Sequence, residues 1–286
     1  MKKSWTLLAA LIYSSAFANT IVPEASRDGK TLNRSALAVA FDKRNFVGAQ
    51  AYDGDYLGEN VQLFGGAYVD EFSFEAKVDF DDVFFDNDFY DVKAGYRFSE
   101  KMALAIGASA SDFIDDPSVE VGLSTISKNL IIAGSLTANF RDNADDNFTL
   151  TAGLGQDDEE LSWEAGIRYD LNDNEDDLLS IFAGTTKVVN NVELDGDIEI
   201  KTRDEFTELY VNFDAELLIQ KEFYVTPGVF FNYREVGNND DDYLGMSGDF
   251  GYRANQIDAT AGLDYVISDN DRRDGLQWRI NAAYFF

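Results

Sequence analysis

Nearly all the side chains in this chain that could do chemistry are carboxylates. The sequence has 53 Asp and Glu residues, no His and no Cys. Without His there is no Ser-His or Asp-His hydrolase site, and without His and Cys the usual zinc ligands are missing. The Ser-x-x-Lys, Gly-x-Ser-x-Gly and Gly-x-x-x-x-Gly-Lys motifs are absent too. Asp214 and Glu216 have the residue types of paired-carboxylate catalysis, but any alternating charged strand produces such pairs. We therefore expect no enzyme activity, no cofactor and no metal site.

Charged residues recur at every second position in several short runs. In the run from Leu161 to Asp170, Glu164 and Arg168 share one parity, while Trp163 and Ile167 share the other. This period of two is typical of a strand with one polar and one apolar face. The residues expected on the polar, inward face of such strands are Asp91, Lys93, Arg97, Glu164, Arg168, Glu208, Asp214, Glu216, Asp249, Arg253, Asp258, Asp264 and Arg279.

Alternating runs of about 8 to 14 residues follow one another from Phe89 to the end of the chain, each long enough to cross a hydrocarbon layer when tilted. Thirteen runs lie in this part, and three of four earlier candidates bring the prediction to about 16 strands, with 14 as the alternative. The four candidates are Leu37 to Phe41, Phe46 to Tyr52, Val61 to Val69 and Phe72 to Phe80. The change of parity across Asp70-Glu71 predicts a hairpin between the last two. We expect one of the first two to be wrong or merged.

The connections alternate between short turns and longer acidic segments. In outer-membrane barrels the short turns face the periplasm and the long loops face outward. The segments expected outside are Asp112 to Ser118, Arg141 to Asn147, Leu171 to Asp177, Glu235 to Tyr243 and Ser268 to Gly275. Leu171 to Asp177 is rich in oxygen ligands, but it lacks the glycine and the distal glutamate of a calcium loop.

Pro227 interrupts the run from Phe223 to Arg234, where a central strand would use its amide hydrogen. A bulge or a later start of the strand is expected there.

The last eleven residues have a clear alternating pattern and an aromatic end. Trp278, Ile280, Tyr284 and Phe286 lie on the apolar parity. This segment resembles the closing strand of porin-like Gram-negative outer-membrane β-barrels. In that class the terminal aromatic residue is read by the barrel-assembly machinery, so the resemblance implies that Trp278, Tyr284 and Phe286 form the assembly signal.

The beginning of the chain has the pattern of a secretory signal peptide. Lys2 and Lys3 are followed by the apolar segment from Leu7 to Tyr13 and by Ala16-Phe17-Ala18, a small-x-small cleavage site. We expect residues 1–18 to be the signal peptide, residues 19–34 a periplasmic lead-in or plug segment, and residues 35–286 the barrel.

These features predict an all-β fold, a transmembrane antiparallel up-and-down β-barrel in the bacterial outer membrane. An open sheet would leave unpaired amides in lipid, so the sheet must close. A water-soluble sandwich or propeller in the periplasm is the alternative fold, but no blade-length repeat is visible.

The predicted function is a channel for passive diffusion of small hydrophilic solutes, in which the acidic loops favour cations. The alternative is a non-conducting barrel with a structural or surface-binding role through those loops. The expected partners are outer-membrane lipid and lipopolysaccharide, the barrel-assembly machinery, and small solutes or ions, in an unknown oligomeric state. A net charge of −30 argues against nucleic acid.

Overall fold

The protein forms one closed antiparallel barrel in which every strand pairs with its neighbours in the sequence. The structure is a computed structural model, and it describes residues 45–54, 60–81, 87–111, 117–128, 130–140, 147–156, 161–172, 177–237, 239–254, 256–268 and 275–286. The first and last strands close the ring, with Phe46 opposite Phe285 and Gly54 opposite Gln277. No helix among these residues is long and apolar enough to span a membrane.

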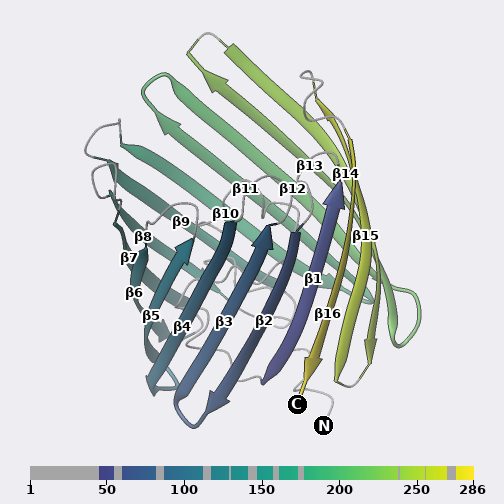
Figure 1. Ribbon diagram of the computed structural model, residues 1–286, viewed down its shortest axis with the longest axis horizontal. Coiled ribbons are helices and arrows are strands. Elements are labelled where there is room, and N and C mark those ends of the chain that lie inside the picture. The colour runs from purple at the N-terminus through teal and green to yellow at the C-terminus, as the bar shows by residue number, and fades with distance from the viewer. Residues whose placement is uncertain are drawn as a thin grey trace.

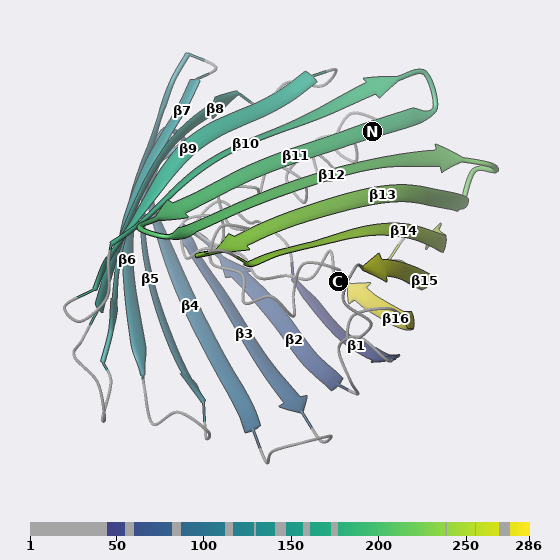
Figure 2. The ribbon, with the colours of Figure 1, turned by 90° about the horizontal axis from the view of Figure 1, so that it is seen from above.

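Sixteen strands make up the ring, and Figures 1 and 2 show how they follow one another around it. Seen from above, β1 to β5 form one side and β8 to β14 the other (Figure 2). The strands are β1 (Phe46–Gly54), β2 (Asn60–Val69), β3 (Phe72–Asp81), β4 (Asn87–Ser99), β5 (Met102–Ser111), β6 (Ser118–Ser127), β7 (Leu130–Asn139), β8 (Asn147–Gln156), β9 (Leu161–Asn172), β10 (Leu178–Val189), β11 (Val192–Arg203), β12 (Phe206–Leu218), β13 (Phe223–Val236), β14 (Asn239–Ala254), β15 (Ile257–Ser268) and β16 (Gly275–Phe285).

The distribution of side chains is the reverse of that in a soluble protein. Large apolar residues such as Leu263, Ile280 and Phe250 are about half exposed on the outside, while charged residues such as Asp264 and Arg279 are buried inside. Alternation along each strand separates the two sets, as a barrel wall between lipid and lumen requires. The predicted all-β barrel of 16 strands is confirmed.

The three strands before Phe89 are β1, β2 and β3, so the run from Phe46 is a strand and the hairpin at Asp70-Glu71 is present. Asp70 has the positive φ of 54° that a two-residue hairpin turn requires. The run from Leu37 to Phe41, the signal peptide and the lead-in lie outside the described residues, as do positions 35–44 of the predicted barrel range.

The predicted long loop from Glu235 to Tyr243 is wrong. Strand β13 continues to Val236 and β14 begins at Asn239, so Asp240, Asp241 and Asp242 belong to a strand. Gly237 has a φ of 61°, which permits the tight turn between the strands. The acidic run hid the strand because polar residues on both faces erase the alternation that marks a strand.

Pro227 is accommodated without a bulge and without a late start. It lies within β13, opposite Gly248 on β14. On its other side the ladder with β12 is interrupted between Asp214 opposite Gly228 and Leu217 opposite Val225, with no shift of register. Proline has no amide hydrogen to donate, and Pro227 lies where the backbone ladder between β12 and β13 is interrupted, so no ladder hydrogen bond is lost there.

Aromatic side chains on the inner face each cover a glycine on the neighbouring strand. Phe230 lies directly opposite Gly245, and Tyr224 lies opposite Gly251. A Cβ atom added to either glycine would overlap the aromatic ring. The same pairing joins Phe182 with Gly166, Phe64 with Gly48 and Phe46 with Gly66. These contacts fix the register of adjacent strands, because only glycine leaves room for the ring.

Replacing Gly245 with alanine is expected to lower the free energy of unfolding by about 1–3 kcal/mol, since the added methyl group forces Phe230 out of its place. That ring is 5% exposed and packs against Tyr243, so it has little room to move. Gly248→Ala on the same strand is the matched control, because nothing lies within 4 Å of its added Cβ. Urea unfolding of the refolded barrel measures both variants. Equal midpoints for the two would contradict the register role of the ring.

Candidate functional site: the inner wall of the barrel

The structure places all thirteen predicted lumen residues on the inner parity of their strands. Ten of them are buried: Asp91, Arg97, Glu164, Arg168, Glu208, Asp214, Glu216, Asp249, Asp264 and Arg279. Asp258 and Arg253 are more accessible, with side-chain exposures of 21% and 41%, while the side chain of Lys93 is 11% exposed, the same as that of Asp91. Their role in a pore stays a prediction, but their positions give the inner face of the barrel much of its charge.

Arg279 on β16 is the centre of the most deeply buried charge cluster. Its Nε and Nη2 atoms donate to the two carboxylate oxygens of Asp249 on β14, at 3.0 and 2.8 Å. Its Nη1 atom donates to Asp264 on β15. Gly262 lies between Asp249 and Arg279 in the register, and a side chain there would collide with the carboxylate. Glycine thus opens the path along which the arginine reaches a strand that is not its neighbour.

Arg253 on β14 makes a similar connection in the other direction around the barrel. Its two terminal nitrogens donate to Glu216 on β12, at 3.0 and 3.3 Å, and its Nε donates to Asp258 at 2.8 Å. The guanidinium lies over the ring of Tyr224, 4.6 Å from the centroid, on the strand between. The hydroxyl of Tyr224 also donates to Asp258, at 2.8 Å. Here an aromatic ring replaces glycine as the surface that the arginine crosses.

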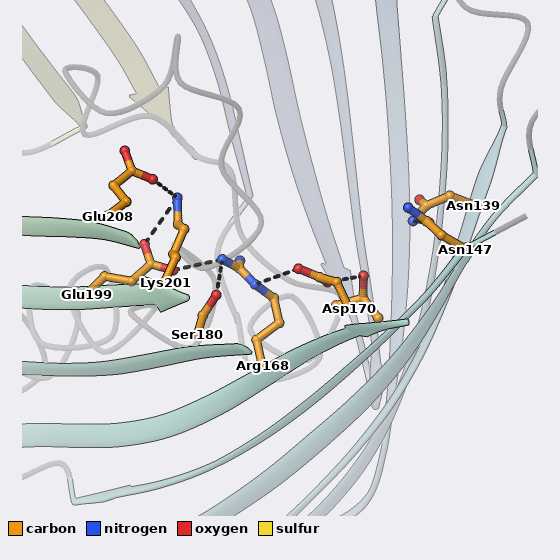
Figure 3. Close-up of polar contacts among 9 residues, drawn as sticks. Asn139, Asn147, Arg168, Asp170, Ser180, Glu199, Lys201 and Glu208 are labelled. Carbon is orange, nitrogen blue, oxygen red and sulfur yellow. Dashed lines mark hydrogen bonds and ion pairs between the residues drawn. The ribbon is translucent and has the colours of Figure 1, made fainter. Parts of the chain in front are cut away.

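Arg168 on β9 crosses β10 in the same way (Figure 3). It donates to Glu199 on β11 at 2.7 Å. It also donates to the hydroxyl of Ser180 on β10, the strand between, at 3.3 Å. Lys201 then bridges Glu199 to Glu208 on β12, with nitrogen–oxygen distances of 3.8 and 3.1 Å. The charge chain ends at β13, where Asn232 donates to Glu208 at 2.9 Å.

The three arginines share one geometry: each binds a carboxylate two strands away and crosses a serine, a glycine or a flat ring between. The contacts of Arg253 with Glu216 and of Arg279 with Asp249 are bidentate, which makes them directional as well as strong. Arg168 meets Glu199 through one nitrogen. All three contacts span two strands. They therefore hold β9 with β11, β12 with β14 and β14 with β16, in addition to the backbone ladders.

Between these clusters lies a group of carboxylates that face one another. Asp195 on β11 is directly opposite Asp214 on β12. Glu164 and Asp197 approach Gly184 from its two sides, with oxygens 3.4 and 2.6 Å from where a Cβ would stand. Thr186 donates to Asp195 at 2.6 Å. This part of the wall carries net negative charge. No group of three or more acidic residues in the described part is arranged to hold a metal ion.

A smaller set of charges lines the first strands. Lys93 contacts Asp91 at 2.6 Å on β4. Arg97 donates to the hydroxyl of Tyr68 on β2 and to the backbone oxygen of Asp70, the latter at 3.3 Å. Arg97 thereby ties the end of β4 to the turn between β2 and β3.

The inner faces of β5 to β8 carry very little charge. Among the described residues there, Glu120 is the one charged side chain, and the others are small or uncharged. Ala103 and Ala105 are fully buried, and Asn139 donates to Asn147 at the far end of β7 and β8 (Figure 3). The described inner positions of β1 and β2 are likewise uncharged, with Gln50, Gln62 and Phe64 among them, so the charge is concentrated on β3, β4 and most of β9 to β16.

Sequence reasoning missed the aromatic residues of the inner face. Phe182, Tyr224, Phe230 and Tyr243 are all buried. Their parity places them inside, since Phe182 alternates with Ser180, but the predicted site residues are all charged ones. The glycine opposite each ring is a cross-strand signal that becomes visible only once the register is known.

The proposed assembly signal lies on the outer face. Trp278, Tyr284 and Phe286 are 40%, 43% and 65% exposed, and the rings of Tyr284 and Phe286 stack with centroids 6.2 Å apart. The amide of Phe286 donates to the backbone oxygen of Asn45 at 3.0 Å, which extends the seam between the first and last strands. Recognition of these residues by an assembly machinery stays a prediction.

Comparison with solved structures identifies the class of the fold. No protein-family model matches the chain, and no curated protein sequence matches it. The structure is similar to OmpT of Vibrio cholerae, described as expressed in the outer membrane, with 9% identity, a TM-score of 0.56, and coverage of 86% of this chain and 97% of that one. OccAB3 of Acinetobacter baumannii matches with 9% identity, a TM-score of 0.60, and coverage of 86% and 99%. A bacterial polysaccharide outer-membrane secretin matches with 10% identity, a TM-score of 0.61, and coverage of 85% of this chain and 98% of that one. The fold is that of porin-like outer-membrane β-barrels.

Arg279→Leu is expected to destabilise the barrel by about 3–5 kcal/mol, because it leaves Asp249 and Asp264 buried without their cation. Arg253→Leu should cost about 1 kcal/mol or less, since the Arg253 side chain is 41% exposed and water replaces it. The triple change Arg279→Leu, Asp249→Asn and Asp264→Asn should recover most of the loss. The urea concentration at which half of each variant is unfolded, read from the band of the folded barrel on a gel, compares the variants. A cost for Arg279→Leu no larger than that for Arg253→Leu would show that the buried pair is not structural.

Proposed function

We propose that the protein is an outer-membrane channel for the passive diffusion of small hydrophilic solutes, with a preference for cations. The observation that carries this proposal is a closed 16-stranded barrel whose outside is apolar and whose buried charged side chains lie on its inner face. Barrels of this strand number are wide enough to hold an aqueous path. The known outer-membrane barrels of similar fold support the location and the class of activity.

The charge of the inner wall supports cation preference. Among the described residues, ten acidic side chains are buried against four basic ones, and nearly all of them lie on the inner parity. The buried cations Arg97, Arg168 and Arg279 are held by partners on the wall. Around Gly184 the carboxylates of Glu164 and Asp197 lie close together, and Asp195 lies opposite Asp214 on the neighbouring strand. A permeating cation would meet a net negative field there.

The first measurement is single-channel conductance of the refolded mature chain in a planar bilayer under a salt gradient. Stable open steps with a reversal potential on the cation side are expected. A heat-resistant barrel that inserts but does not conduct would overturn the channel, and the non-conducting, surface-binding alternative would replace it. The same proposal holds that the protein catalyses no reaction, since passive diffusion requires no catalysis.

Arg253→Gln should raise the permeability ratio of K⁺ over Cl⁻ by about twofold, since one unit charge acting over ~8 Å of water is worth about 0.5 kcal/mol. Glu216 and Asp258 then face the lumen without their cation. Lys187→Gln removes the same charge from the outer parity of β10, where the side chain is exposed, and should leave selectivity unchanged. The reversal potential measures both variants. Equal shifts would contradict the placement of Arg253 in the conducting path.

A further inference from the structure

Three cations on the inner wall each lie between two carboxylates that come from different strands. They are Arg279 between Asp249 and Asp264, Arg253 between Glu216 and Asp258, and Lys201 between Glu199 and Glu208. A guanidinium or an ammonium group has several N–H donors and no acceptor, so it can bind two carboxylates at once. The wall itself therefore shows which chemical groups fit between two inward carboxylates.

A fourth pair of carboxylates on the wall meets in a different way. Glu164 on β9 and Asp197 on β11 both lie opposite Gly184 on β10. Glycine places no side chain between them, and one oxygen of each carboxylate lies within 3.4 Å of the point where a Cβ of Gly184 would stand. The two side chains thus meet across a glycine, as Asp249 and Arg279 do across Gly262, but both of them are acidic.

Glu164 is the member of this pair that points most clearly to a ligand. It is 8% exposed, and within the described part of the chain it makes no hydrogen bond and no ion pair. Its neighbour on the other side is Gly155 on β8, which has no side chain to offer. Arg168, two positions along the same strand, binds Glu199 instead (Figure 3). A buried carboxylate is stable beside a cation or a donor, so its place next to Asp197 favours a cationic ligand.

We propose that Glu164 and Asp197 form a binding subsite for small solutes that carry a guanidinium or primary ammonium group. Asp197 is half-buried, so the subsite is reached from the lumen. Gly184 lies near the middle of β10, which places the subsite well inside the barrel. This inference rests on the proposed channel, and it narrows the preference for cations to one class of solute.

Binding is tested first without any current, with methylguanidinium as the probe and the uncharged methylurea as its isostere. In equilibrium dialysis of the refolded full mature chain, Glu164→Gln should weaken the binding of methylguanidinium at least about tenfold, because a hydrogen bond between two charged groups is lost. Glu120→Gln is the matched control, since Glu120 is a glutamate on the inner face of β6 that is 6% exposed. It should leave the binding unchanged, and methylurea should not bind.

Three results of the dialysis would overturn the subsite. The first is an equal loss of binding in the two variants, and the second is binding of methylurea as strong as that of methylguanidinium. The third is tighter binding of Mg²⁺ that is also lost in Glu164→Gln, since the pair would then be a metal site and not a site for an organic cation.

Urea unfolding without added ligand shows whether another part of the chain already neutralises Glu164. The midpoint of Glu164→Gln should equal or exceed that of the natural chain, because the substitution removes a negative charge beside Asp197. A lower midpoint, or failure of the variant to fold, would mean that a stabilising partner of Glu164 had been lost, and it would overturn the subsite.

Conductance in a planar bilayer separates the subsite from the channel. Methylguanidinium should reduce the K⁺ current through the natural chain and through Glu120→Gln, and it should have little effect on Glu164→Gln. A barrel that binds the probe but does not conduct would overturn the channel and leave the binding pair in place. A conducting barrel whose current responds equally in all three chains would overturn the subsite and leave the channel.

Discussion

The whole structure depends on the hydrogen-bonded seam between β1 and β16. Lipid offers no partner to a backbone amide, so a sheet that crosses a membrane is stable only when it has no free edge. The nine residue pairs from Phe46–Phe285 to Gly54–Gln277 provide this closure. Closure in turn gives every strand one inner and one outer face. The alternation of polar and apolar residues then places the polar ones inside and the apolar ones outside. The final Phe286 adds one more backbone bond to the same seam.

Within the ring, side chains add a second level of connection. The backbone ladders join each strand to its neighbours, whereas Arg168, Arg253 and Arg279 join strands two apart. Aromatic rings over glycine fix the register of individual pairs. These devices are concentrated between β9 and β16, together with most of the charge. Among the described residues, the inner faces of β5 to β8 carry a single charged side chain, Glu120, and no arginine that could reach across a strand.

The sequence was sufficient to predict the strand number, the closure and the inner position of the charged residues. These follow from a period of two, which is local and survives in any strand with one apolar face. It was not sufficient where the argument needed partners on other strands. The reach of Arg279 to Asp249 depends on Gly262 lying between them, and nothing near Arg279 in the sequence shows this. The tight turn at Gly237 was missed because polar residues fill both faces of the strand ends beside it. Pro227 was judged from the rule for central strands, whereas the structure leaves the ladder unpaired on one side of it.

The strands are unequal in length, with 10 residues in each of β5 to β8 and 14 and 16 in β13 and β14. Figure 1 shows the strands of the far wall rising above the near one. A membrane has one thickness, so the surplus of about 20 Å along the longest strand stands in water. The opening of the barrel is consequently oblique. At the end of the barrel where β13 turns into β14, a tall wall bearing Asp242, Arg234 and Glu235 therefore stands on one side and a low wall on the other, so under the proposed function this opening would be reached more easily from the low side.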